Sequence, residues 1–91
     1  MHDTLFEVSS SLGFDTVQQE SLRFKQLLKD KSVTHIKFAL QGVEHCDSAG
    51  VALLIDIKRQ AQRHKKNVVF DQLSKPIVAM ATFCGVEGLL C

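Results

Sequence analysis

The first segment with a regular hydrophobic pattern runs from Thr4 to Leu12 and is followed by Gly13. Phe6, Val8 and Leu12 occupy positions of one parity, so their side chains would lie on one face of an extended chain. This alternation predicts a half-buried strand that ends at Gly13.

A helix is predicted directly after this strand. Asp15 or Thr16 is suited to cap it, because a side-chain oxygen at that position accepts a backbone N–H of the first turn. Apolar residues then recur at helical spacing until the polar run "KDKS", and these residues are Val17, Phe24, Leu27 and Leu28.

The segment from Val33 to Leu40, "VTHIKFAL", is rich in β-branched and aromatic residues. Ile36, Phe38 and Leu40 fall on one of its faces, which predicts a central strand. After Asn67, the short apolar segment "VVFDQL" predicts another strand.

Two more helices are predicted in the second half. The first runs from Ser48 to His64 and ends in the basic run "RHKK", which suits a helix C-terminus. The second follows Ser74, with Pro76 in its first turn, and stops at Gly85. The tail "VEGLLC" is a candidate for a last short strand. The apolar stripe of the second helix consists of Ile77, Met80, Ala81 and Cys84.

Strands and helices are therefore expected to alternate along the chain. This order predicts an α/β fold in which a mixed, mostly parallel sheet packs with helices, because each helix returns the chain to the same edge of the sheet. Loops at the carboxyl ends of the strands are the favoured functional positions in such folds. One of these loops lies in "EHCDSAGVALL", residues 44–54.

The helix that follows this loop has an apolar stripe that is expected to face the core. Val51 and Ile55 fall outside that stripe, on a flank where they either pack under a neighbouring loop or form a ridge for a partner. Arg59 and Arg63 are expected to be solvated or to form polar rim contacts. At about 100° per residue, the stripe consists of Gly50, Leu53, Leu54, Ile57 and Ala61.

Small residues mark the start of this helix. Asp47 and Ser48 are both suited to cap it, and a cap contributes about 1 kcal/mol. Capping does not account for the succession of Ser48, Ala49 and Gly50, whose smallness leaves backbone amides open at the positive end of the helix. We therefore expect an anion or a closely fitting protein surface to approach this turn.

The composition fits one globular domain over residues 1–91, with 45% hydrophobic and 23% charged residues. Its net charge of +1 provides no overall field that would favour nucleic acid or an anionic membrane. The N-terminus lacks a signal-peptide pattern, and no apolar run approaches the roughly 20 residues that span a bilayer. We expect a cytoplasmic protein that recognises its partner locally.

Three cysteines, Cys46, Cys84 and Cys91, stand at unrelated spacings, which is typical of small buried hydrophobic residues and not of a disulfide framework. His45 lies beside Cys46, but no CxxC or HxxxH pair accompanies them. We expect neither a metal ion nor another cofactor.

Ser48 resembles a nucleophile in one respect, because "CDSAG" contains Ser-x-Gly at a strand-to-helix turn. Cys46 stands where a nucleophile elbow has its first glycine, and a triad draws its members from separate segments, unlike His45 and Asp47. We expect no catalytic residue and no enzyme activity. Two alternatives stay open: phosphorylation of Ser48 switches a binding surface, or an unmodified Ser48 belongs to a close protein contact.

The strand "HIKFAL", the loop "VEHCDSAG" and the helix "VALLIDIKRQAQRHKK" resemble the STAS domain, a small α/β module named for sulfate transporters and anti-sigma factor antagonists. The similarity extends from Thr4 to Leu90, and its most specific part is the D-S-[SA]-G turn. In anti-sigma factor antagonists this turn is D-S-S-G-L-G, and a partner kinase phosphorylates the first serine, here Ser48. Ala49 and Ala52 depart from that pattern, and "VSSSLGF" departs from the usual first loop.

"DSAGVALL", "KRQAQRH" and "LSKPIVAMATFCGVEGLL" are more similar to the MlaB-like branch of the family, the cytoplasmic STAS subunits of phospholipid ABC transporters. This resemblance implies a non-catalytic chain, peripheral to the inner membrane, that binds an MlaF-like ATPase subunit and supports outer-membrane lipid asymmetry. The alternative partner is an anti-sigma factor kinase that phosphorylates Ser48. The implied partner-binding residues are Asp47, Ser48, Ala49, Gly50, Val51, Ile55 and Arg59.

Overall fold

The computed structural model describes residues 3–8 and 10–90, over which five strands and four helices are observed. Among these residues, no helix has both the length and the apolar character needed to cross a bilayer. The elements are β1 Asp3–Glu7, β2 Ser11–Leu12, α1 Val17–Lys29, β3 His35–Ala39, β4 His45–Cys46, α2 Ser48–Arg63, β5 Asn67–Asp71, α3 Lys75–Phe83 and α4 Glu87–Leu90.

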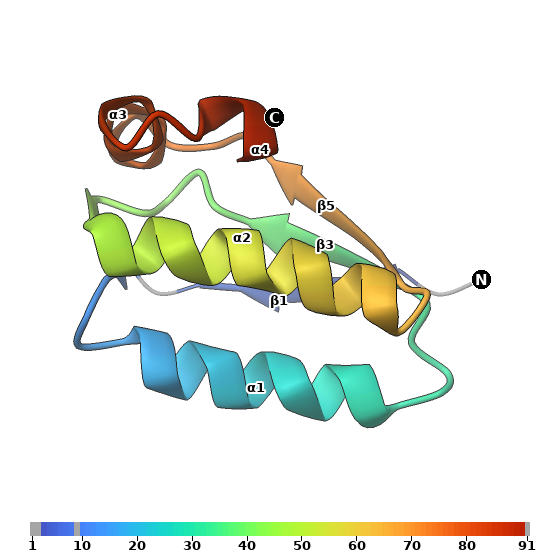
Figure 1. The fold of residues 1–91 in the computed structure, drawn as a ribbon. Coiled ribbons are helices and arrows are strands. Elements are labelled where there is room, and N and C mark those ends of the chain that lie inside the picture. The colour runs from blue at the N-terminus through green and yellow to red at the C-terminus, as the bar shows by residue number, and fades with distance from the viewer. Residues whose placement is uncertain (1–2, 9, 91) are drawn as a thin grey trace.

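Parallel strands form the centre of the fold. The main sheet has the order β1-β3-β5, and β2 and β4 form a separate parallel pair. Figure 1 shows α1 and α2 side by side over one face of the main sheet, with α3 and α4 beyond β5. Each of α1 and α2 returns the chain to the start of the next parallel strand, and the predicted α/β class is therefore confirmed.

Phenylalanine side chains join the sheet to the helical layer. The strand register pairs Phe6 with Phe38 and Phe38 with Phe70. The rings of Phe6 and Phe38 are stacked with centroids 4.5 Å apart, and the ring of Phe70 meets Phe38 edge-on at 5.4 Å. Phe24 of α1 reaches Phe38 at 5.7 Å, so Phe38 is the point where sheet and helix pack.

Most predicted elements and core positions are confirmed. Pro76 lies in the first turn of α3, and Gly85 has a φ of +73°, the left-handed conformation that ends a helix. The predicted core faces of the central strand and of α2 are both buried, and they consist of Ile36, Phe38 and Leu40, and of Gly50, Leu53, Leu54, Ile57 and Ala61.

The first predicted strand is divided into two. β1 ends at Glu7, and the carbonyl of Ser10 accepts the amides of Glu44 and His45 at 2.7 and 3.1 Å. These bonds move the chain from the main sheet to β4, with which β2 pairs. The prediction of one continuous strand from Thr4 to Leu12 is therefore wrong.

The tail forms a helical turn, α4, and the candidate last strand is absent over the described residues up to position 90. This turn buries Leu90 in the core, and the ammonium group of Lys58 donates to the Leu90 carbonyl at 3.1 Å. A helical turn is favoured because it returns an apolar residue to the space beside α2.

The start of α2 lies very close to β2. Gly50 is buried, and a Cβ at this position would overlap the carbonyl oxygen of Leu12 and crowd the Leu12 side chain. The amide of Asp47 donates to the same carbonyl at 3.3 Å. The absence of a side chain at Gly50 therefore allows α2 to begin against β2.

We expect Gly50→Ala to lower the free energy of unfolding by about 3 kcal/mol, because the new methyl group meets backbone that cannot rotate away. Urea unfolding followed by circular dichroism measures this change. Gly88→Ala in α4 is the matched control, since nothing lies within 4 Å of its added Cβ and alanine favours a helix over glycine by about 1 kcal/mol. Equal stability of the two variants would contradict the close approach.

Candidate functional site

Asp47, and not Ser48, caps α2. The backbone of Asp47 is extended, and its Oδ1 accepts the amide of Gly50 at 3.0 Å. Ser48 is the first residue of the helix itself and is exposed. Its hydroxyl has no hydrogen-bond partner among the residues that the structure describes. The cap therefore leaves Ser48 available to solvent.

The second carboxylate oxygen of Asp47 holds a different loop. Oδ2 accepts the amide of Phe14 at 2.9 Å, and Phe14 lies between β2 and α1. The hydrogen bond from Phe14, followed by the one from Gly50, lowers the pKa of Asp47 from its ordinary value of 3.8. Asp47 is therefore ionised near neutral pH and joins two loops that are 33 residues apart.

The predicted site residues on α2 divide into buried and exposed positions. Ser48 is exposed and Ala49 is partly exposed. Ile55 is half-buried against the core, and Arg59 is exposed further along the helix. Ala52 and Arg59 follow Ser48 by four and eleven residues, so all three lie on one side of α2.

The expectation that Val51 forms an outer ridge is wrong, because its side chain is only 2% exposed. α2 is in contact with α1, α3, α4 and β5, so its buried arc is wider than a single stripe. Gly50 is also buried, and its smallness is required by Leu12 inside the protein. Neither residue offers a surface to a partner.

The cysteines differ in environment. Cys46 is half-buried, and this burial, with a further contribution from the charge of Asp47, raises the pKa of its thiol to about 11. The thiol therefore stays protonated near neutral pH, which disfavours it as a nucleophile or metal ligand. Cys84 is exposed, contrary to the prediction that it is buried, and Cys91 lies outside the described residues.

Two exposed phenylalanines flank the Ser48 turn, and sequence analysis did not identify them as site residues. Phe14 is 80% exposed and Phe83, the last residue of α3, is 87% exposed. The hydrogen bond to Asp47 places the backbone of Phe14 beside the turn. The sequence offered one signal for Phe14, which is a phenylalanine next to a glycine in a predicted loop. It offered none for Phe83, which comes near the turn only through the tertiary fold.

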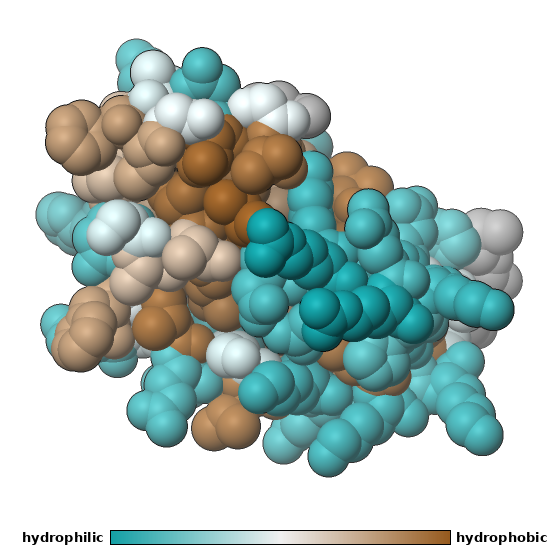
Figure 2. Space-filling view, in the orientation of Figure 1, coloured by the Kyte–Doolittle hydropathy of each residue, from teal (hydrophilic) through white to brown (hydrophobic). Residues whose placement is uncertain are grey.

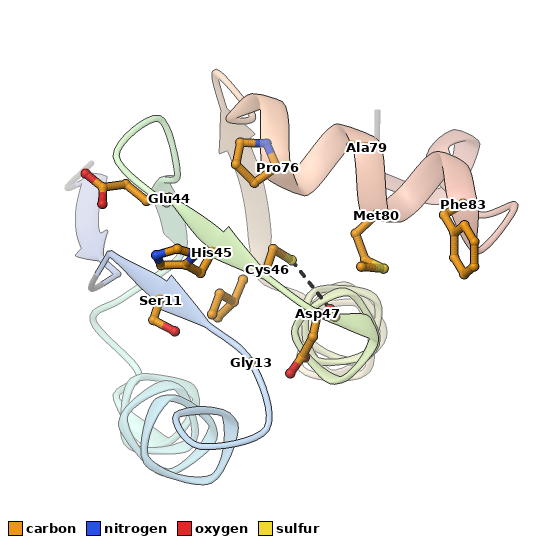
Figure 3. Close-up of a pocket in the computed structure, with 11 residues that line it drawn as sticks. Ser11, Gly13, Glu44, His45, Cys46, Asp47, Pro76, Ala79, Met80 and Phe83 are labelled. Carbon is orange, nitrogen blue, oxygen red and sulfur yellow. Dashed lines mark hydrogen bonds between the residues drawn. The ribbon is translucent and has the colours of Figure 1, made fainter.

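A shallow groove of about 480 Å³ separates β4 from α3 and opens beside this turn. Figure 3 shows Met80 directed from α3 toward the wall that Cys46 and Asp47 form, while Phe83 lies beyond Met80 at the end of α3. Figure 2 shows hydrophobic surface gathered at the end of the molecule where α2 begins, while the end where α2 stops is covered by hydrophilic side chains. We call the surface formed by Phe14, Ser48, Ala49, Met80 and Phe83 the Ser48 face.

The groove contains His45 and Glu44 as well as Asp47. Within the described part of the chain, no group of three His, Cys, Asp or Glu side chains lies close enough to hold a metal ion. The arrangement provides an open, largely apolar surface with polar groups at its edge, which is suited to protein contact.

A comparison with protein families finds one described as "Mlab, STAS domain", whose model matches residues 2–91. A comparison with curated proteins finds no match.

The two hydrogen bonds of Asp47 predict a pH-dependent contribution to stability. The folded pKa lies below the ordinary value of 3.8, so the contribution is fully present above that pH and is lost as pH falls through the folded pKa. We expect the stability difference between wild type and Asp47→Asn to be constant near neutral pH and to shrink below about pH 4.

Urea titrations from neutral to acidic pH measure this difference. Asp30, whose pKa is lowered by hydrogen bonds from Ser32, titrates in the same range, but it is common to both proteins and cancels. A stability difference that is independent of pH would contradict the role of the Asp47 carboxylate.

Proposed function

The chain belongs to the MlaB-like STAS domain family, and we propose that it is a non-catalytic subunit of a phospholipid ABC transporter. In this role it binds the MlaF-like ATPase subunit and supports the assembly or activity of the complex in maintaining outer-membrane lipid asymmetry. It is cytoplasmic and is held at the inner membrane through that partner.

The exposure of Phe14 and Phe83 beside the Ser48 turn is the observation that carries this proposal. Isolated apolar residues on a surface need no explanation. Phe83, however, lines the groove, and Phe14 is hydrogen-bonded to Asp47, which lines it too. Two largely exposed rings so placed are typical of protein interaction sites. Aromatic side chains are enriched among the residues that dominate binding energy. The family's function in protein contact and the apolar character of this face therefore support the same conclusion.

Residues of α2 provide further contacts with the partner around the two phenylalanines. Ser48 and Ala49 are small and keep the approach of the partner close, with Ile55 as a half-buried apolar contact. Arg59 lies about 16 Å from Ser48 along the same side of the helix, where it forms a polar rim. Val51 and Gly50 are buried and contribute indirectly, because their packing fixes the start of α2.

We expect Phe14→Asp combined with Phe83→Asp to abolish co-purification with the ATPase subunit of the transporter from the same organism. Both side chains are exposed, so the domain should stay folded by circular dichroism. Loss of two apolar anchors should weaken the affinity at least about a hundredfold, or about 2.7 kcal/mol.

Leu22→Asp is the matched control, because Leu22 is 57% exposed on α1 and does not line the groove. It should retain the ATPase. If the double variant also retains the ATPase, the Ser48 face is excluded as the docking surface. If both the double variant and the Leu22→Asp control lose the ATPase, the loss reflects a general effect of added charge.

The alternative function is that of an anti-sigma factor antagonist regulated at Ser48. The exposed, unengaged hydroxyl favours it, because a kinase can reach this oxygen without opening the helix cap. A phosphate at the first position of α2 would meet the positive end of the helix but would also face the charge of Asp47.

If this alternative holds, an anti-sigma factor kinase should add one phosphate to the wild-type chain and none to Ser48→Ala, as measured by intact-mass analysis. The Ser48→Ala variant removes only an exposed hydroxyl and should retain wild-type stability. An unmodified wild-type chain after incubation with the kinase and ATP would rule the alternative out.

A further inference from the structure

Asp47 occupies a position from which one carboxylate connects the Phe14 loop to the start of α2. Its Oδ1 accepts the amide of Gly50 in α2, and its Oδ2 accepts the amide of Phe14 in the preceding loop. Both carboxylate oxygens are therefore engaged inside the protein. A carboxylate used in this way positions other groups more than it offers its own charge to a partner.

The Phe14 loop is ordered from its other side by Thr16. The amide of Gly13 donates to the Thr16 hydroxyl at 3.0 Å, and the amides of Thr16 and Val17 donate to the Gly13 carbonyl at 2.8 and 2.9 Å. These bonds give the loop its internal shape. They do not reach α2, whereas the bond between Phe14 and Asp47 does.

Gly13 completes the contact. A Cβ at position 13 would lie 2.7 Å from Oδ2 and 2.9 Å from Cγ of Asp47, which is closer than such atoms approach in proteins. The carboxylate therefore fits against the bare backbone of Gly13 while it holds the next amide. The loop and the side chain are complementary in shape as well as in hydrogen bonding.

From this geometry we infer that Asp47 is a positioning residue that holds the exposed ring of Phe14 in place beside Ser48 before a partner arrives. The inference rests on the proposed function for its effect on binding, but the preassembly itself is a property of the free chain. A preassembled face avoids the entropy cost of ordering a loop on binding. Asp47 would thus support affinity without contacting the partner.

Asp47→Asn separates positioning from capping. Asparagine is as good an N-cap as aspartate, so its single carbonyl oxygen is expected to keep the bond to Gly50. The amide group that replaces Oδ2 cannot accept the Phe14 amide. Amide hydrogen exchange of the free full-length chain should therefore show protection of Phe14 falling at least about tenfold, with Gly50 changed less than about twofold.

Binding to the ATPase subunit gives the second measurement. Asp47→Asn and Phe14→Ala should each weaken affinity about tenfold, and the double variant should be no weaker than either alone, because both remove the same contact. Gly13→Ala should have the same effect as Asp47→Asn while the carboxylate keeps its charge. Asp15→Asn is the charge-matched control in the same loop and should leave exchange and affinity unchanged.

Unchanged protection of the Phe14 amide in Asp47→Asn would overturn the inference. Additive losses in the double variant would also overturn it, since they would mean that Asp47 contacts the partner directly. If the wild-type chain does not bind the ATPase, the proposed function fails, and the exchange of the free chain still decides whether Asp47 positions Phe14.

Discussion

The contact between Gly50 and the carbonyl of Leu12 sets the geometry on which the rest of this surface depends. Because position 50 has no side chain, α2 begins directly against β2, and the loop after β2 lies within hydrogen-bonding distance of the helix cap. A longer separation would place the Phe14 amide beyond reach of Asp47. One internal packing constraint therefore brings together the parts of the Ser48 face.

The face is an open surface and not an enclosed cleft, and the core beneath it is filled by the packing of sheet and helices. Apolar groups at the end of α3 and in the first loop surround a turn with little side-chain bulk. Such an arrangement suits recognition of another folded protein, where a few aromatic anchors provide affinity and small residues permit close approach. STAS domains act through protein–protein interaction, and the chain belongs to that family.

Capping and recognition are assigned to neighbouring residues. Asp47 satisfies the helix amide and remains charged, so Ser48 does not have to turn its hydroxyl inward. Cys46 on the other side is protonated because it is half-buried next to that charge. Of these three consecutive residues, Cys46 has an unreactive protonated thiol, Asp47 stabilises the turn, and Ser48 is exposed to solvent.

The sequence alone determined the order of the main strands and helices, the core stripe of α2 and the position of the DSAG turn, because hydrophobic periodicity and helix caps are local properties. It could not determine that β1 and β2 join different strands, since that choice depends on bonds between Ser10 and residues beyond position 40. It could not place Val51 in the core, because the width of the buried arc of α2 is set by α1, α3 and α4. The small size of Gly50 was visible in the sequence, but only tertiary structure showed that it faces Leu12, that Phe14 is hydrogen-bonded to Asp47, and that Phe83 lines the same groove as Asp47. Those contacts join residues distant in the chain, and no local pattern specifies them.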